Sequence, residues 1–329
     1  MSGCAQRLFP MFSANAILMA AITASCAVVS AGDAPTRRFI AADSSRQRVA
    51  IIGDDGTTEW ERKIGPLHDL QVLPNGHILL QDTWTHVFEV DPETNAIVWE
   101  YEATDAPDYD GRRIEIHAFQ RLPDGGTMVV ESGRARLLEL QNDGSIQHWI
   151  PLKVEHPDPH RDTRLARRLA NGNYLVCHEG DGAIREYDRG GRVVWELRVP
   201  LFGRERADGH GVEAFGNQCF SALRLPKGNT LAGTGNGHSV IEFTPAGQDV
   251  WSVHQNDLPG IQLAWVTSIQ LLPSGNILIT NCHAGPENPQ LIEIDRKHRV
   301  VWSFHDFERF GNALTNAQIL SVDGQSIVR

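Results

Sequence analysis

The chain has 329 residues, of which 41% are hydrophobic, and it carries a formal net charge of -11. This acidic balance argues against a nucleic-acid partner, because binding to a phosphate backbone relies on basic surfaces. The hydrophobic fraction and the 30 glycines are typical of a turn-rich globular protein with a buried core, and a single domain can have this length.

The chain begins with a segment that resembles an export signal, because Arg7 precedes an apolar run at Ala16–Val29 and small residues follow this run. We expect residues 1–31 to be a cleaved signal peptide and residues 32–38 to be a short linker. The protein would then be exported, either periplasmic or secreted, with no membrane span after cleavage. A lipoprotein anchor at Cys26 and a retained membrane helix are alternatives, although the run is short for a span.

Beyond the linker, units of four short strands repeat along the chain. One unit, from Leu67 to Ala103, contains the segments HDLQVL, HILLQD, HVFEV and AIVWEYE, separated by turn-forming residues. A tryptophan that follows a turn recurs from unit to unit: Trp60, Trp99, Trp149, Trp195, Trp251 and Trp302. A turn of the Leu-Pro-x-Gly type also recurs, with glycines 49, 47, 56, 47 and 49 residues apart: Gly76, Gly125, Gly172, Gly228, Gly275 and Gly324.

This spacing is typical of one four-stranded blade of a β-propeller. The chain opens with three strands, in residues 37–64, and closes with a single strand and turn, in residues 316–329, so the two ends together complete one blade. No long segment has the apolar period of a major helix. We therefore predict an all-β fold, a six-bladed β-propeller closed by strands from both termini and covering residues 39–329. The repeated tryptophans should pack between neighbouring blades.

Cysteines and glycines give two smaller predictions. Cys177, Cys219 and Cys282 lie in different units, so we expect them to be buried free thiols. The glycines from Gly233 to Gly237 superficially resemble a nucleotide-binding loop. They join two strands rather than opening a helix, and this context favours a structural role.

The two faces of the predicted ring differ, because one carries only tight turns and the other carries long polar loops such as residues 102–116, 151–163 and 199–218. Function usually lies in long loops on a rigid scaffold. Counting from each turn glycine locates the strand ends on the long-loop face. The residues at which the innermost strands begin are His68, His117, Arg164, Phe220, Thr267 and Asn316, and those at which the next strands end are Asp82, Glu131, His178, Thr234, Asn281 and Asp43.

We predict that these residues surround the mouth of the central channel, where converging polar side chains could bind an anion, hold a metal or transfer protons. Any single member could instead serve only to hold loop backbone. The long loops add further ligand-binding candidates on the same face: His210, Asn236, His238, Asn256, Trp265 and His283. Trp84, Trp265 and Phe220 could supply stacking surfaces.

One loop has an alternation of metal-competent side chains, at His156, Asp158, His160 and Asp162. In an extended conformation these four side chains would share a face and could bind a metal ion. An ordinary surface loop can also have this composition, so both interpretations stay open.

The xDxxGxxxW and LPxGNxL elements resemble the repeats of quinoprotein-like and arylsulfotransferase-like propellers over essentially the whole mature chain. The likeness is clearest at Asn229–Leu231, at Asn276–Leu278 and between Asp91 and Glu100. It implies an exported propeller. Quinone-dependent dehydrogenases place an adjacent cysteine pair against their cofactor, and this sequence has no such pair. We therefore predict no quinone and no other cofactor, with a divalent metal as the alternative.

The resemblance to bacterial arylsulfotransferases implies one enzymatic function, sulfuryl transfer through a histidine at the channel mouth. The resemblance gives the catalytic roles to His68, His117, Arg164 and Asn316. One histidine would be the nucleophile and a second the acid or base, while arginine and asparagine would stabilise the anion.

We favour a different function, in which the mouth binds a small-molecule, anionic or carbohydrate ligand without catalysis. A third alternative is a lactonase-like, metal-dependent hydrolase. Its inward-facing ligands would be Glu131, Asn281 and Asp82.

Overall fold

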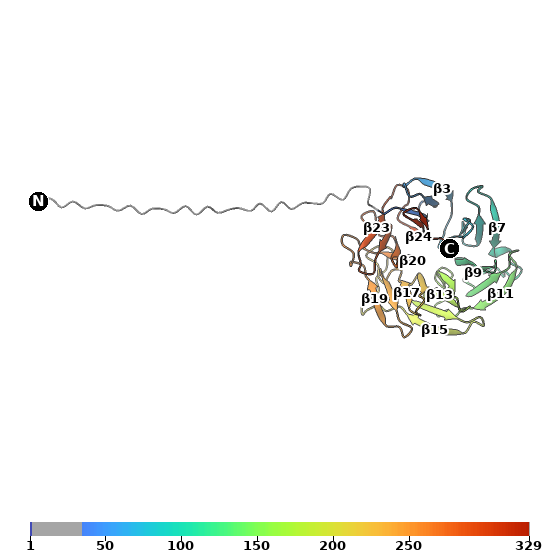
Figure 1. The fold of residues 1–329 in the computed structure, drawn as a ribbon. Coiled ribbons are helices and arrows are strands. Elements are labelled where there is room, and N and C mark those ends of the chain that lie inside the picture. The colour runs from blue at the N-terminus through green and yellow to red at the C-terminus, as the bar shows by residue number, and fades with distance from the viewer. Residues whose placement is uncertain (2–34, 329) are drawn as a thin grey trace. The chain divides into compact units, whose positions relative to one another are not determined.

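Six antiparallel β-sheets form a ring in the computed structural model, which describes Met1 and residues 35–328 (Figure 1). The expected signal peptide, apart from Met1, and residues 32–34 of the expected linker lie outside the described residues. A single 3-10 helix, η1 (Ala103–Asp105), accompanies the strands of the described part. The prediction of an all-β, six-bladed propeller is therefore confirmed. Among the described residues, no helix is both long and apolar enough to cross a bilayer.

Five blades each consist of four consecutive strands, and the first strand of each is the innermost. Blade 1 contains β4 (Gln71–Val72), β5 (Ile78–Gln81), β6 (His86–Val90) and β7 (Ile97–Glu102). Blade 2 contains β8 (Glu115–Arg121), β9 (Thr127–Ser132), β10 (Arg136–Leu140) and β11 (Ile146–Pro151). Blade 3 contains β12 (Ala166–Arg168), β13 (Tyr174–His178), β14 (Ala183–Tyr187) and β15 (Val193–Arg198).

The next two blades follow the same plan. Blade 4 contains β16 (Ser221–Arg224), β17 (Thr230–Gly233), β18 (Val240–Phe243) and β19 (Asp249–Val253). Blade 5 contains β20 (Trp265–Leu271), β21 (Ile277–Cys282), β22 (Leu291–Ile294) and β23 (Val300–Phe304). The six predicted turn glycines all have positive φ, from 77° to 92°, which explains why glycine recurs there.

Blade 6 is built from both ends of the chain. Its strands are β1 (Arg37–Asp43), β2 (Arg48–Ile52), β3 (Thr58–Lys63), β24 (Leu314–Val322) and β25 (Gln325–Ser326). β24 pairs with β1, for example through Ala317 and Ala41, and this pairing closes the ring as predicted. β25 adds a fifth strand that was not predicted. It pairs with β24 through a two-residue hairpin, Asp323 and Gly324, both with positive φ.

The core is divided among the six gaps between neighbouring blades, each of which contains one cluster of buried apolar side chains. Val176 and Met128, for example, meet between blades 3 and 2, and Cys177 meets Phe243 between blades 3 and 4. The second and third strands of a blade are therefore apolar on both faces. Cys177, Cys219 and Cys282 are buried and free, as expected.

Five of the six repeated tryptophans contact the following blade. Trp60, Trp195 and Trp251 each donate an indole N–H to an oxygen in the next blade's last turn, at 2.8, 2.8 and 3.0 Å. The Trp302 ring lies 5.5 Å from that of Phe39, and the Arg121 guanidinium lies 4.6 Å from the Trp99 ring.

Trp149 is different, and the prediction for it is wrong because its side chain is 55% exposed. Each of the other five tryptophans comes four positions after a turn residue with positive φ. Trp149 comes five positions after the corresponding turn residue, Gly144. His148 occupies the equivalent place, and its Nε2 lies 3.0 Å from the carbonyl oxygen of Arg189 in blade 3. A shift of one residue along a strand turns the side chain to the opposite face.

Candidate functional site

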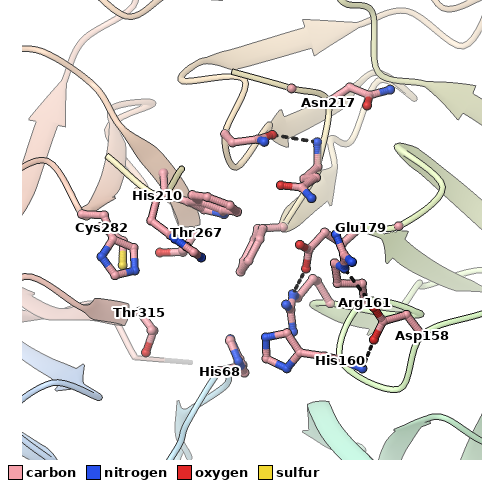
Figure 2. A pocket seen from close by; sticks show the side chains of 18 of the residues that line it. His68, Asp158, His160, Arg161, Glu179, His210, Asn217, Thr267, Cys282 and Thr315 are labelled. Atoms are coloured by element: carbon pink, nitrogen blue, oxygen red, sulfur yellow. Dashed lines mark hydrogen bonds and ion pairs between the residues drawn. The ribbon is translucent and has the colours of Figure 1, made fainter. Parts of the chain in front are cut away.

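A cavity of about 1310 Å³ lies at the long-loop mouth of the ring. Its wall is formed by loops that precede the innermost strands and by loops that join the second and third strands. The lining residues come from within segments 66–68, 155–164, 179–181, 206–220, 265–267, 282–283 and 313–315, together with Ser44, Trp84 and Asn236. Figure 2 shows the labelled side chains around an open centre, with His68 and His160 together and His210 on the opposite side.

Several of the predicted residues line this cavity. They are His68, Arg164, His210, Asn236, Trp265 and His283 from the candidate site, and Trp84, Phe220 and Thr267 from the wider set. Four of them, His68, Arg164, Phe220 and Thr267, are starts of innermost strands, whereas none of the predicted second-strand ends lines the cavity. The chemical roles of all these residues stay predictions.

His68 lies at one side of the cavity in a group of aromatic rings. Its imidazole stacks on Trp84, with centroids 5.3 Å apart and planes at 21°, and lies 4.8 Å from the His117 ring and 6.1 Å from the His160 ring. Burial, together with the charge of Arg164, holds the pKa of His68 well below its usual value. A neutral ring at pH 7 keeps a nitrogen lone pair available.

His117 lies behind the cavity wall and is fully buried. Its Nδ1 lies 2.8 Å from the carbonyl oxygen of Thr163, and its Nε2 lies 3.1 Å from Oε2 of Glu115. Because a carbonyl oxygen only accepts, Nδ1 must carry the proton in this contact. Burial and the Arg164 guanidinium lower the pKa of His117 to about 4.

Arg164 connects this group to the cavity. Its Nη1 lies 3.1 Å from Nδ1 and 3.2 Å from Nε2 of His117, and with Nδ1 protonated only Nε2 can accept from it. The guanidinium lies 4.7 Å from the centre of the Phe220 ring, and Nε forms an ion pair with Glu179. The side chain is only 3% exposed. The arginine is thus held rigidly beside the histidines, with part of its charge balanced.

Asn316 contributes by holding His68 rather than by lining the cavity. Its Nδ2 donates to the carbonyl oxygen of His68 at 3.0 Å and approaches Oδ1 of Asp69 at 3.4 Å. Asp69 in turn pairs with Arg167 at 2.7 Å. The position of His68 therefore depends on a buried network on the innermost strands.

The opposite wall is also aromatic. Trp265 stacks on His210, with centroids 5.2 Å apart and planes at 19°, and the His283 ring lies 5.6 Å from that of His210. Burial and the neighbouring His210 lower the pKa of His283. Trp265 and Phe220 pack together with Cys282 in a small apolar cluster at the mouth.

Three predicted residues, the ligands of the lactonase-like alternative, do not come together. Glu131 is buried between Arg136, at 2.5 Å, and the Tyr101 hydroxyl, at 2.9 Å. Asn281 accepts from the backbone N–H of Ala264 at 2.7 Å, and Asp82 pairs with His86 at 2.8 Å. None of the three lines the cavity, because the strand-end rule does not say whether a side chain points to the axis or to a neighbouring blade.

Three further candidates also lie away from the cavity wall. His178 is buried between the Asp162 carbonyl oxygen, at 2.7 Å, and the Tyr187 hydroxyl, at 2.8 Å. His238 is buried against the carbonyl oxygen of Ala214. Asn256 is an exposed loop residue that accepts from Gln262 at 3.2 Å. These contacts support the structural interpretation of the three residues.

The loop with alternating histidines and aspartates does not form one metal site, because its side chains diverge. His156 turns to Asp181 at 3.1 Å, and Asp162 accepts from the Gly133 backbone N–H at 2.8 Å. His160 turns instead to Glu115, with Nδ1 2.6 Å from Oε2. The sequence reasoning missed Glu115, although it lies two residues before His117 on the same strand, a spacing that places both side chains on one face.

These features define a class: a six-bladed PQQ-like propeller with a polar and aromatic cavity at its long-loop mouth. Residues 12–101 and 114–320 match the sequence family described as outer membrane protein assembly factor BamB. The chain belongs to this family. No curated protein sequence matches the chain.

Among solved structures, a protein of unknown function from Bacteroides caccae is similar, with a TM-score of 0.71 and 22% identity over 86% of this chain and 98% of that one. Virginiamycin B lyase from Staphylococcus aureus has a TM-score of 0.53 and 12% identity, over 80% and 78% of the two chains. A catalytically inactive variant of that lyase, solved with quinupristin, has a TM-score of 0.53 and 10% identity over 84% and 86%. At these sequence identities, the similarity shows only that this chain shares a fold with those proteins.

Proposed function

We propose that the protein binds a carbohydrate, or a comparable polar small molecule that carries an anionic group, in the mouth cavity. Three polar atoms of cavity-lining residues support this proposal. Trp265 Nε1, Thr267 Oγ1 and Gln218 Oε1 are buried and have no hydrogen-bond partner among the described residues. Buried polar groups are nearly always satisfied, so these atoms favour a partner that enters the cavity.

The size and lining of the cavity indicate the class of ligand. Its volume, about 1310 Å³, exceeds the roughly 300–1,000 Å³ of ordinary small-molecule sites, which favours an oligosaccharide over a single sugar. Trp84 and Trp265 offer aromatic faces on opposite walls, and such faces pack against sugar rings. Arg164 and Arg206 supply guanidinium groups suited to sulfate or carboxylate.

The test is calorimetric titration of the folded protein with a panel of sulfated and uronic-acid oligosaccharides, comparing wild type with Thr267→Val. Loss of the Thr267 hydroxyl should weaken binding by about fivefold, since one hydrogen bond contributes about 1 kcal/mol. The same substitution should leave the free energy of unfolding unchanged or raise it slightly, because this hydroxyl has no described partner in the free protein.

Thr127→Val is the matched control, because the Thr127 hydroxyl accepts from Arg121 at 2.6 Å away from the cavity. It should lower the free energy of unfolding by about 1 kcal/mol and leave affinity unchanged. The proposal fails if no member of the panel binds to folded protein, or if Thr267→Val binds its ligand as tightly as wild type.

Sulfuryl transfer is a second candidate function, favoured by the environment of His68. The ring nitrogens of His68 form no hydrogen bond within the described structure, while Asn316 and Trp84 hold the residue beside Arg164. A ring nitrogen would attack sulfur and form an N–S bond as the S–O bond to the aryl group breaks, with the electron pair leaving on the aryl oxide. An acceptor phenol would then take the sulfuryl group and release the imidazole.

Transfer from an aryl sulfate to a phenol should be measured with wild type, His68→Ala and His305→Ala. If His68 is the nucleophile, its variant should lose at least about 100-fold in turnover, which is the lower range for covalent and acid–base catalysis. His305 is exposed, and its variant should keep wild-type turnover. No turnover by folded wild type would exclude this function and leave ligand binding unaffected.

A further inference from the structure

We propose that Glu115, His117 and His160 bind a divalent transition-metal ion of the zinc class in the wall of the cavity. Glu115 and His117 come from β8, and His160 comes from the loop before β12. Their donor atoms lie within 4.8 Å of one another. One carboxylate oxygen and two imidazole nitrogens form a donor set that zinc uses in catalytic sites.

The hydrogen bonding of His117 leaves the lone pair of its Nε2 available to a metal ion. Nδ1 donates to the Thr163 carbonyl oxygen, so Nε2 of the neutral ring carries a lone pair. That lone pair faces Oε2 of Glu115, a second acceptor, at 3.1 Å, and both side chains are almost completely buried. Two buried acceptors at hydrogen-bond distance favour a positive group beside them. The Arg164 guanidinium, with Nη1 3.2 Å from Nε2, is one such group, and a proton or a metal ion between the two acceptors would be another.

One metal ion would fit this geometry. Oε2 of Glu115 lies 3.1 Å from His117 Nε2 and 2.6 Å from His160 Nδ1, so one oxygen faces two imidazole nitrogens. Two imidazole N–H groups could both donate to this oxygen, because a carboxylate oxygen accepts more than one hydrogen bond, whereas a single ion could coordinate all three atoms at once. Arg113 contacts the other oxygen of Glu115, and Thr163 orients His117, which are the outer contacts that hold metal ligands in place.

The proposed site is open on the cavity side. His160 is partly exposed and lines the cavity, while the Trp84 ring lies 5.5 Å from both the His117 and the His160 rings. Water, or an oxygen of a ligand in the cavity, could therefore complete the coordination, as in sites with three protein ligands. Figure 2 shows His160 beside His68 at this part of the wall.

A second group with similar donors lies nearby but is already paired with arginines. Glu155, His156 and Asp181 also lie within metal-binding distance of one another. Asp181 pairs with Arg185 at 2.5 Å, and Glu155 pairs with Arg198 at 2.6 Å. Both carboxylates of this group are thus paired with arginines, whereas Glu115 pairs with Arg113 through one oxygen and turns the other to two histidines. The second group supplies a control histidine from the same loop as His160.

The experiment uses the purified full chain, stripped with a chelator and titrated calorimetrically with Zn²⁺ and, separately, with Co²⁺. Wild type should bind one ion, and Co²⁺ should give the visible absorption of a low-coordinate imidazole site. His160→Ala should weaken binding by at least about 100-fold, the upper range for lost outer contacts. His156→Ala should leave the affinity unchanged. Circular dichroism should show that both variants are folded, which the loop position of both residues favours.

Glu115→Gln is the second variant, because it keeps the shape of the side chain and removes the charge. It should weaken Zn²⁺ binding while the ring remains folded. Folded wild type that binds no ion would overturn the proposal. Equal weakening by His156→Ala and His160→Ala would overturn the assignment of the ligands. The metal titration contains no organic ligand, so its outcome is independent of the proposed carbohydrate binding.

Discussion

Histidines at strand ends on the same face of the ring acquire different properties in this molecule because their neighbours differ. His68 opens onto a cavity and has no hydrogen bond to its ring among the described residues, whereas His178 is enclosed by Asp162 and Tyr187. The sequence shows the residue type and its place in the repeat. It does not show which neighbour each ring nitrogen meets, since these partners come from other loops and blades.

His178 should make the protein sensitive to acid. Burial and Arg185 lower its pKa to about 4, against about 6.5 in an unfolded chain. Between these values the unfolded state binds more protons, so the stabilisation is complete above about pH 6.5 and is lost as the pH falls towards 4. At pH 5 this one group should reduce the free energy of unfolding by about 2 kcal/mol relative to pH 7.5.

Urea denaturation of wild type and His178→Gln at pH 7.5 and pH 5 would measure this effect. The variant should lose about 2 kcal/mol less than wild type between the two values, even if it is less stable at both. His305→Gln replaces an exposed histidine and should show the same pH dependence of the free energy of unfolding as wild type. If His178→Gln lost as much free energy of unfolding as wild type between pH 7.5 and pH 5, then the pKa of His178 would not differ between the folded and unfolded states.

At the scale of single elements, the register of the outermost strand decides which residue joins two blades. β3, β7, β15, β19 and β23 direct their tryptophan to the next blade, whereas β11 directs His148 there and leaves Trp149 exposed. The repeated tryptophan predicted the number of blades correctly. The extra residue after Gly144 was the signal for the exception, because side chains alternate along a strand.

Trp60 and Trp149 offer a comparison of one residue type at related positions. Trp60 is 9% exposed and packs against blade 1, whereas Trp149 is 55% exposed. Trp60→Ala should lower the free energy of unfolding by about 3–5 kcal/mol, and Trp149→Ala should lower it by less than about 1 kcal/mol. Guanidinium denaturation, monitored by far-ultraviolet circular dichroism, would measure both. Equal losses would contradict the difference in packing between the two strands.

At the scale of the whole molecule, closure of the ring brings distant parts of the chain to one mouth. The wall of the cavity includes Ser44 near the start of the propeller and Thr315 near its end, together with loops from the blades between them. Arg164 reaches both His117 and Phe220, which belong to separate segments of the sequence. A cavity assembled in this way requires every blade to be folded, so its contacts are nonlocal throughout.

The blade count, the closure by both termini and the face that carries the long loops could all be predicted from the sequence. Each depends on local patterns: turn glycines, strand alternation and the lengths of segments between turns. The contact of Glu115 with His160 could not be predicted, because the two residues are 45 positions apart in the sequence. The separation of Asp82, Glu131 and Asn281 could not be predicted either, because the three side chains point to different neighbours. Repeats specify where each strand ends, but packing between blades sets the direction in which a side chain leaves its strand, and only the assembled ring contains that packing.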